Sequence, residues 1–219
     1  LGDVYKRQPS MQFGSAVMTK ADLALEALAG IGTVLRRRGD RLGVAASVTG
    51  GLDLMRPPVG DRRGLSASLA AASRLQPPAT PGRTDLAAAV AAMGKVATHR
   101  GAVFVISDFP ASDALENALG TLGRRHHVFA VEVRDPRESE LPDLGVVRLR
   151  DMETGGTRLI DTADPRFRDR LRHVAAQRDQ ATGAMLRRAR ADRIVLDTGG
   201  DWVLAMARAL SVRRTRGAA

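Results

Sequence analysis

One continuous apolar run, residues 102–106, most constrains the fold of this chain. A strand that is apolar at every position is typical of a parallel sheet covered on both faces, because side chains that point to either face are buried. Residues 128–133 have a similar character, and a segment of helical composition lies between the two. Strands that alternate with helices imply βαβ units. We therefore expect an α/β fold built on a doubly wound, mainly parallel, Rossmann-like sheet.

Other segments add peripheral hairpins, a last strand and further helices to this sheet. We expect two hairpins, formed by residues 42–48 with 52–56 and by residues 146–150 with 157–160, and a last strand at residues 193–196. Pro57 and Pro58 should stop the second strand of the first hairpin, because proline cannot donate a backbone hydrogen bond. Glu116 is placed for a capping interaction in the helix that begins at Ser112. Helices are expected over residues 20–38, 65–75, 85–99, 112–122, 164–189 and 201–210.

The composition excludes several classes of protein. There is no cysteine, which removes structural disulfides, thiolate catalysis and zinc–thiolate sites. Aromatic residues make up 3% of the chain, which leaves few side chains for base stacking. No apolar run approaches the roughly 20 residues needed to cross a bilayer, and the N-terminus lacks the apolar region of a signal peptide. We expect no membrane span and a cytoplasmic location.

The formal net charge of +10 raises the question of nucleic-acid binding. The basic residues are almost all arginine, and they are scattered in short clusters. Three of these clusters lie near predicted helix C-termini, where cations interact favourably with the helix dipole, and this is the interpretation we favour. A basic groove for phosphate is the alternative.

Three oxygen-bearing side chains are candidates for a metal site. Ligands of open α/β sheets bind beyond the carboxyl ends of the strands, and we place Ser10, Thr84 and Asp108 there. Two hydroxyls and a carboxylate suit Mg²⁺ or Mn²⁺, with waters completing the octahedron. Each residue also has an ordinary structural explanation. Thr84 could cap a helix, Asp108 could form a turn, and Ser10 could be a solvated loop hydroxyl.

Several segments taken together resemble domain-of-unknown-function family 58. They are residues 10–14, 39–44, 83–86, 106–109, 130–138, 141–142, 148–151, 159–162 and 201–202, in this order. The likeness covers nearly everything after Pro9. The family is similar to the von Willebrand factor A domain, whose metal-ion-dependent adhesion site reads Asp-x-Ser-x-Ser, then a distant Thr and a distant Asp. The resemblance implies that the last Ser is Ser10, the Thr is Thr84 and the Asp is Asp108.

The chain departs from this motif at two positions. The first Asp and the first Ser would fall on Lys6 and Gln8. An ammonium repels a dication and offers no acceptor atom, so we expect Mg²⁺ or Mn²⁺ to bind weakly or not at all.

The adjacent pair His126 and His127 is a weaker metal candidate, because neighbours in a strand point to opposite faces.

The N-terminal segment explains the departure in one of two ways. Residues 1–8 lack the apolar character of a central strand and resemble read-through from a sequencing adaptor. We therefore interpret them as foreign and expect them to be displaced from the sheet or poorly ordered. The alternative is a degenerate, metal-free domain. We expect the von Willebrand factor A-like domain to span residues 9–212, with a basic tail at residues 213–219 and a further native stretch before the domain.

The resemblance implies a non-enzymatic protein-interaction module in which a partner's carboxylate completes the metal coordination. It also implies work beside a MoxR-type AAA+ ATPase in protein maturation or complex remodelling. Two other classes stay open, a basic protein associated with nucleic acid without specific recognition, and a metal-dependent hydrolase. Salt-dependent DNA binding with basic residues gathered on one face would favour the former. A hydrolase would need a general base near Asp108, and the sequence indicates none.

Overall fold

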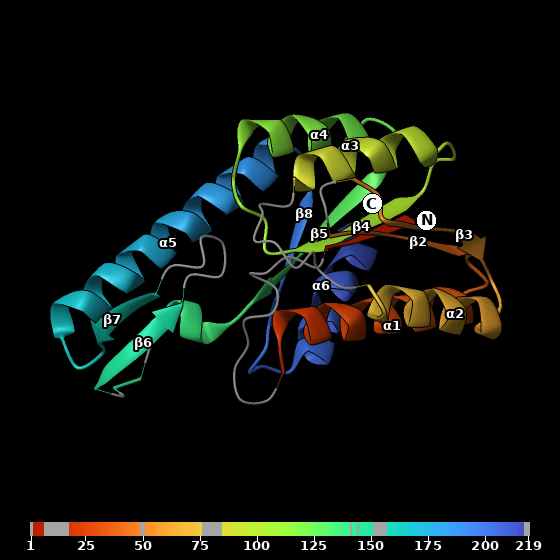
Figure 1. The fold of residues 1–219 in the computed structure, drawn as a ribbon. Coiled ribbons are helices and arrows are strands. Elements are labelled where there is room, and N and C mark those ends of the chain that lie inside the picture. Colours follow the sequence, from red (N-terminus) through yellow and green to blue (C-terminus); the bar gives the residue numbers. More distant parts are fainter. Residues whose placement is uncertain are drawn as a thin grey trace.

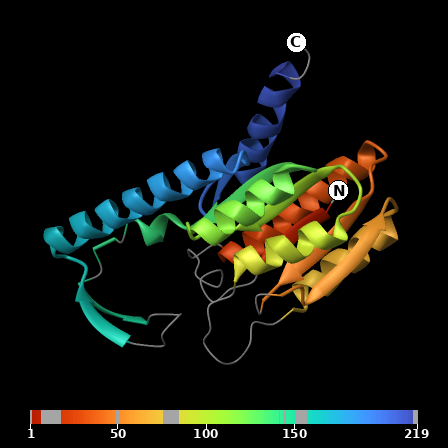
Figure 2. The same ribbon diagram turned by 90° about the horizontal axis from the view of Figure 1, so that it is seen from above.

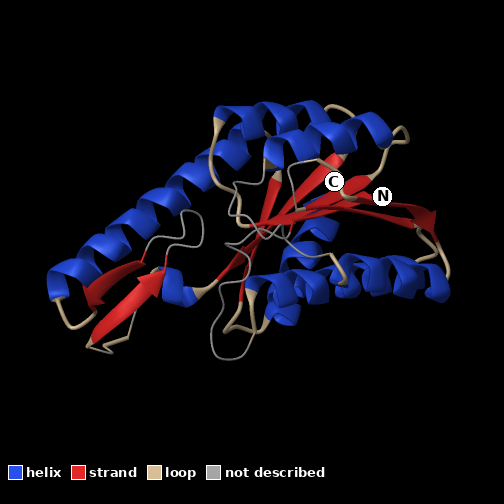
Figure 3. Ribbon diagram, viewed as in Figure 1, coloured by secondary structure: helices blue, strands red, loops and turns tan. Residues whose placement is uncertain are grey.

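The computed structural model describes residues 2–6, 18–48, 51–75, 85–140, 142–143, 145–150 and 157–216. Helices cover both faces of a central sheet, and a separate two-stranded hairpin lies to one side of it (Figures 1 and 3). The strands are β1 (Gly2–Lys6), β2 (Leu42–Ser47), β3 (Leu54–Val59), β4 (Ala102–Ser107), β5 (His127–Arg134), β6 (Val146–Arg150), β7 (Thr157–Asp161) and β8 (Asp192–Asp197). The helices are α1 (Lys20–Arg37), α2 (Arg62–Ser73), α3 (Leu86–Val96), α4 (Asp113–Gly123), α5 (Pro165–Arg188) and α6 (Trp202–Arg216), with a short 3-10 helix, η2 (Pro136–Glu138).

The central sheet has six described strands in the order β3-β2-β1-β4-β5-β8. Neighbouring strands are parallel except at one edge, where β3 pairs antiparallel with β2. The four runs expected to contribute to one sheet, residues 42–48, 102–106, 128–133 and 193–196, do share this sheet. Both predicted hairpins form, one as β2–β3 and the other as the separate pair β6–β7. The prediction of a mainly parallel α/β sheet is therefore confirmed.

The N-terminal strand β1 lies in the middle of this sheet. Gly2 pairs with Gly43 of β2 on one side and with Val103 of β4 on the other. The expectation that this segment is displaced is therefore wrong for the backbone of Gly2–Lys6. Without a strand at this position, one edge of β2 and one edge of β4 would keep unpaired backbone groups inside the sheet. Backbone pairing can satisfy those groups whatever side chains the strand carries.

Two main apolar cores lie on opposite faces of the sheet, beneath the helices that cover each face in the ribbon views (Figures 1 and 2). Strand β4 contributes to both, because successive side chains alternate between faces. Phe104 and Ile106 join the core beneath α1, α2 and α6. Val103 and Val105 join the core beneath α3, α4 and α5. This alternation is the reason why the whole run is apolar.

Helix α1 covers the sheet and sets the position of its own first residue. Leu23, Leu28 and Ile31 recur on one side and are at most 3% exposed, and burial of each such side chain stabilises the fold by about 1.5–3 kcal/mol. Thr19 caps the helix, and its side chain and that of Asp22 form a capping box. The start of α1 is thus held at the edge where the parallel strands end.

Two local expectations are wrong, those for β3 and for Glu116. Strand β3 runs through Pro57 and Pro58 and ends at Val59, which an edge strand permits because one of its sides is unpaired. In α4, Ser112 accepts a hydrogen bond from the Leu115 amide, whereas Glu116 forms an ion pair with Arg188 and takes no part in capping. The N-cap of α3 is Asp85, which accepts from the Ala88 amide, and Thr84 itself lies outside the described residues.

Candidate functional site

A cluster of polar side chains lies at the carboxyl edge of the sheet, where the parallel strands end. It consists of Lys20 from α1, Asp108 after β4, Asp135 and Glu138 after β5, and Thr198 after β8. We call these five residues the carboxyl-edge cluster. Lys20 is 118 residues away from Glu138 along the chain, and the fold brings them into contact. Strands β4, β5 and β8 are adjacent in the sheet, so the segments that follow them, which carry four of the five residues, begin side by side.

The cation of the cluster is the buried ammonium of Lys20. Its Nζ lies 2.5 Å from Glu138 Oε1 and 3.7 Å from Asp108 Oδ2, and its side chain is 1% exposed. A lysine in the first turn of a helix opposes the helix dipole, and burial adds a desolvation cost. The two carboxylates offset these costs. Lys20 thereby links α1 to the ends of β4 and β5.

The backbone after β4 holds Asp108 in place. Phe109 has φ of 44°, a conformation that is strained for a bulky side chain, and it is fully buried. Its carbonyl oxygen accepts a hydrogen bond of 3.0 Å from the Thr182 hydroxyl of α5. The Asp108 carboxylate itself accepts from the Ser107 hydroxyl at 3.3 Å and is 19% exposed. Packing from a distant helix thus maintains the sharp turn that presents Asp108.

The connector after β5 is braced by a second buried carboxylate. Asp135 is 2% exposed, and its oxygens accept from the Arg137 amide at 2.8 Å and from the Thr198 hydroxyl at 2.9 Å. The Thr198 amide donates in turn to the carbonyl of Arg134. These bonds join the loops after β5 and β8 and position η2, which carries Glu138.

Partial burial raises the pKa of the Glu138 carboxyl, and the neighbouring negative charges of Asp108 and Asp135 act in the same direction. The charge of Lys20 and its hydrogen bond lower that pKa and oppose the rise. The Glu138 side chain remains 41% exposed. Glu138 therefore presents a carboxylate to solvent while it holds a buried cation.

The structure places one of the three predicted metal ligands. Asp108 lies at the carboxyl end of β4, as predicted. Ser10 and Thr84 lie outside the described residues, and so does Gln8, so the convergence of the three side chains stays a prediction. Lys6 ends β1 and its backbone pairs with Ser47, which puts the end of that strand beside the end of β4.

The described residues of this edge do not fit a metal ion. Within the part of the chain that the structure describes, no group of three or more His, Asp or Glu side chains is arranged to hold a metal. The Lys20 ammonium lies 3.7 Å from Asp108, where it compensates the carboxylate and would repel a dication. The charge beside Asp108 is thus balanced by the protein itself.

Sequence reasoning missed Lys20 and Glu138 as members of the site. A usable signal was present for Lys20, because a cation in the first turn of a helix is unfavourable unless acidic groups compensate it. Glu138 belonged to a polar connector after a buried strand, which is where ligand-binding residues of α/β sheets are expected. Neither signal could pair the two residues, since they lie 118 residues apart in the sequence.

Comparison with known proteins places the chain among uncharacterised bacterial proteins. It is 35% identical over 210 residues to the uncharacterized protein Rv1480 of Mycobacterium tuberculosis, a match that covers 95% of this chain and 65% of that protein. It is 40% identical over 119 residues to the uncharacterized protein MAV169 of Mycobacterium avium, covering 54% of this chain and 69% of the other. The chain thus spans less than two thirds of the length of the Rv1480 protein.

A solved structure supports the fold. The chain superposes on an aerotolerance-related membrane protein from Bacteroides fragilis, crystallised with multiple mutations to serine, with a TM-score of 0.62 and 12% identity over 98% of this chain and 97% of that one. None of the described helices of the present chain is both long and apolar enough to cross a membrane. The model of the family described as "Protein of unknown function DUF58" matches residues 4–182, and the chain therefore belongs to the DUF58 family.

Proposed function

We propose that this chain is a non-enzymatic protein-interaction module of the von Willebrand factor A-like class, which binds its partner at the carboxyl edge of the sheet. The observation that carries the proposal is the position of Asp108, at a strand end and in the place that the adhesion-site motif gives to its last carboxylate. A hydrogen bond from Thr182 braces the turn after β4, and a buried ion pair ties α1 to η2, and both contacts restrict the movement of this edge. Such rigidity lowers the entropic cost of binding a partner.

The adhesion site that the motif implies is incomplete in this chain, since Lys6 and Gln8 stand at two of its ligand positions. Mg²⁺ or Mn²⁺ would suit the intact site. In this chain the positive charge beside Asp108 comes from Lys20. We therefore expect partner binding here to continue when divalent cations are removed.

The proposed partner is a MoxR-type AAA+ ATPase, and the proposed setting is protein maturation or complex remodelling. Both follow from the family resemblance. The carboxyl edge contributes a partly exposed acidic surface, because Glu138 and Asp108 are 41% and 19% exposed. A partner loop with hydrogen-bond donors would meet these oxygens directly.

The test is binding of the purified chain to the MoxR-type ATPase of the same source, measured by titration calorimetry with and without EDTA. Asp108→Asn should weaken binding at least tenfold, because it removes the charge at the centre of the surface. Asp169→Asn, on an exposed part of α5, is the matched control and should bind like the parent. Equal losses in the two variants, or no binding by the parent, would contradict the proposal.

A further inference from the structure

The opposite edge of the sheet collects the C-terminal ends of four helices. In a parallel α/β sheet each helix returns to the edge where the next strand begins. Helices α1, α3, α4 and α5 end there, directly before β2, β4, β5 and β8. We call this end of the molecule the amino edge. Its loops come from distant parts of the sequence, and the topology alone makes them neighbours.

Exposed cations stand in every one of these loops. The exposed basic residues include Arg36, Arg37 and Arg38 before β2, Lys95 and Arg100 before β4, Arg124 and Arg125 before β5, and Arg187 and Arg190 before β8. Arg41 and Arg188 are exposed as well, but Arg41 donates to the Pro58 carbonyl and Arg188 pairs with Glu116. Helix dipoles favour cations at such ends. The helix dipole accounts only for cations within the last turn of a helix. Arg100 and Arg190 lie beyond the ends of α3 and α5, so the dipole does not explain them. Described acidic groups near these loops are engaged: Asp40 pairs with Arg38, Asp192 pairs with His127, and Asp61, after β3, accepts from the Gly64 amide.

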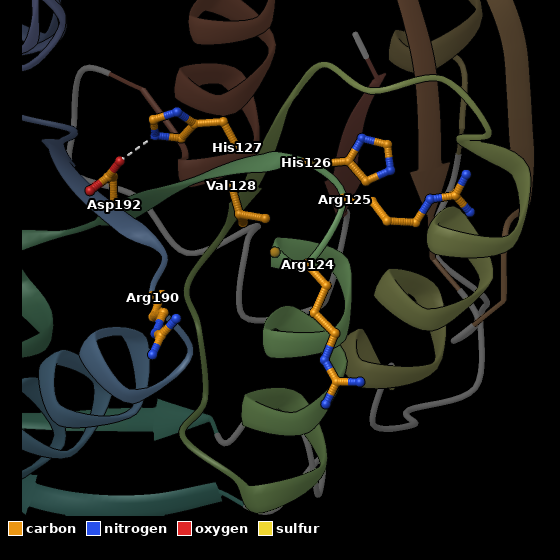
Figure 4. A pocket seen from close by; sticks show the side chains of 8 residues that line it. Arg124, Arg125, His126, His127, Val128, Arg190 and Asp192 are labelled. Carbon is orange, nitrogen blue, oxygen red and sulfur yellow. Dashed lines mark hydrogen bonds and ion pairs between the residues drawn. The ribbon is translucent and has the colours of Figure 1, made fainter. Parts of the chain in front are cut away.

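A shallow depression of about 440 Å³ lies in this edge at the starts of β5 and β8. Arg124, Arg125 and Arg190 line it together with the His127–Asp192 pair. Figure 4 shows Arg124 and Arg190, from two different loops, both extending away from that pair. Among the described residues, no carboxylate lies within 4.0 Å of the guanidinium of Arg124 or Arg190. Their charges are therefore available to a ligand.

We propose that the amino edge binds the phosphate backbone of duplex nucleic acid without reading its sequence. Guanidinium groups match phosphate oxygens in geometry as well as charge, and here they project from adjacent loops along one edge. Single-stranded nucleic acid would need exposed aromatic side chains for stacking. The aromatic residue described beneath this depression, Phe129, is 9% exposed and is stacked against His127.

The same surface is a poorer match to a lipid bilayer. Membrane-surface binding combines basic residues with exposed apolar side chains that enter the acyl region. Among the described residues, the depression and the elements around it (α4, β5, β8) carry no large exposed hydrophobic side chain. Elsewhere on the amino edge, the exposed large hydrophobic side chains are single valines, Val34 at the end of α1 and Val96 at the end of α3. This proposal is independent of partner binding at the carboxyl edge, because the two surfaces lie at opposite ends of the strands.

The test measures fluorescence anisotropy of a labelled 20-base-pair DNA duplex of mixed sequence, titrated with the full chain between 50 and 200 mM NaCl. The variant removes three cations of the amino edge that make no side-chain hydrogen bond or ion pair among the described residues: Arg100→Gln, Arg124→Gln and Arg190→Asn. Asparagine is chosen at position 190 because the backbone there has φ of 56°, a region that it tolerates. The matched control removes the same charge from the exposed part of α5: Arg166→Gln, Arg170→Gln and Arg178→Gln.

Each phosphate contact contributes about 0.9 to the slope of log affinity against log salt. The parent should therefore show a slope of about −3 or steeper. The amino-edge variant should bind at least tenfold more weakly at 50 mM NaCl, with a slope shallower by up to about 2.7, which is three contacts at about 0.9 each. The control should keep the parent slope. Equal losses in both variants, a salt-independent parent, or binding to phosphatidylserine vesicles without binding to the duplex would overturn the proposal. If the triple variant does not fold, Arg124→Gln alone tests the proposal. Its slope of log affinity against log salt should be shallower than that of the parent by about 0.9, the contribution of one phosphate contact.

Discussion

Removing either partner of the Lys20–Glu138 ion pair should destabilise the protein, and the two losses should differ in size. In Lys20→Met, a chain of similar length fills the space of the lysine side chain, and the Glu138 and Asp108 carboxylates are left behind. Glu138 is 41% exposed and Asp108 is 19% exposed, so water can reach both carboxylates. In Glu138→Gln, the ammonium is left behind, and Lys20 is 1% exposed. Only Glu138→Gln leaves a charge that has lost its nearest partner at a position that water cannot reach.

The burial of each partner sets the expected magnitudes. Breaking a fully buried pair by removing one partner costs about 3–5 kcal/mol, whereas exposed pairs contribute about 0–1 kcal/mol. We expect Lys20→Met to lower the free energy of unfolding by about 1 kcal/mol, near the exposed limit. Glu138→Gln should lower it by about 2–3 kcal/mol, because Asp108 at 3.7 Å still compensates part of the charge.

Urea denaturation followed by circular dichroism at pH 7 measures both losses, with the slope m expected to stay unchanged. Arg172→Met is the control, since Arg172 and Asp169 form a surface pair with side chains 59% and 68% exposed. It should change the stability by less than about 0.5 kcal/mol. The double variant Glu138→Gln with Asp108→Asn should lose more than the sum of its singles. A larger loss in Lys20→Met than in Glu138→Gln would refute the reasoning.

Three further predictions concern the metal site, the pH response and the core. Replacing Lys6 by Asp and Gln8 by Ser should give measurable Mn²⁺ binding in titration calorimetry, with Thr84→Ala abolishing the gain; tight binding by the parent would contradict this. Burial lowers the pKa of His126, so the stability it contributes is present above its unfolded pKa of about 6.5 and is lost as the pH falls toward the folded value. Thermal melts between pH 8 and 5 should show this loss, and His126→Gln should reduce the slope. Leu28→Ala, at a fully buried position of α1, should cost about 2–5 kcal/mol in urea denaturation, and a loss under about 1 kcal/mol would mean that α1 packs less tightly than described.

Local patterns predicted much of the fold. The uniform apolar run of β4 indicated a strand buried on both faces, and the two cores beside it show why every position had to be apolar. Asp108 was predicted at a strand end and lies there. Such predictions succeed because burial and backbone hydrogen bonding impose short periods that neighbouring residues display together.

The tertiary structure decided what no local pattern contains. The place of β1 between β2 and β4 follows from backbone groups that need partners, although its side chains argued against a central strand. Pro57 and Pro58 are tolerated because β3 lies at the edge, a position that only the strand order defines. Lys20 contacts Glu138, and the basic residues of four separate loops share one edge, because the order of the strands in the sheet differs from their order along the chain. Local sequence determines which residues can be buried or form strands, whereas contacts between distant charges depend on which strands become neighbours.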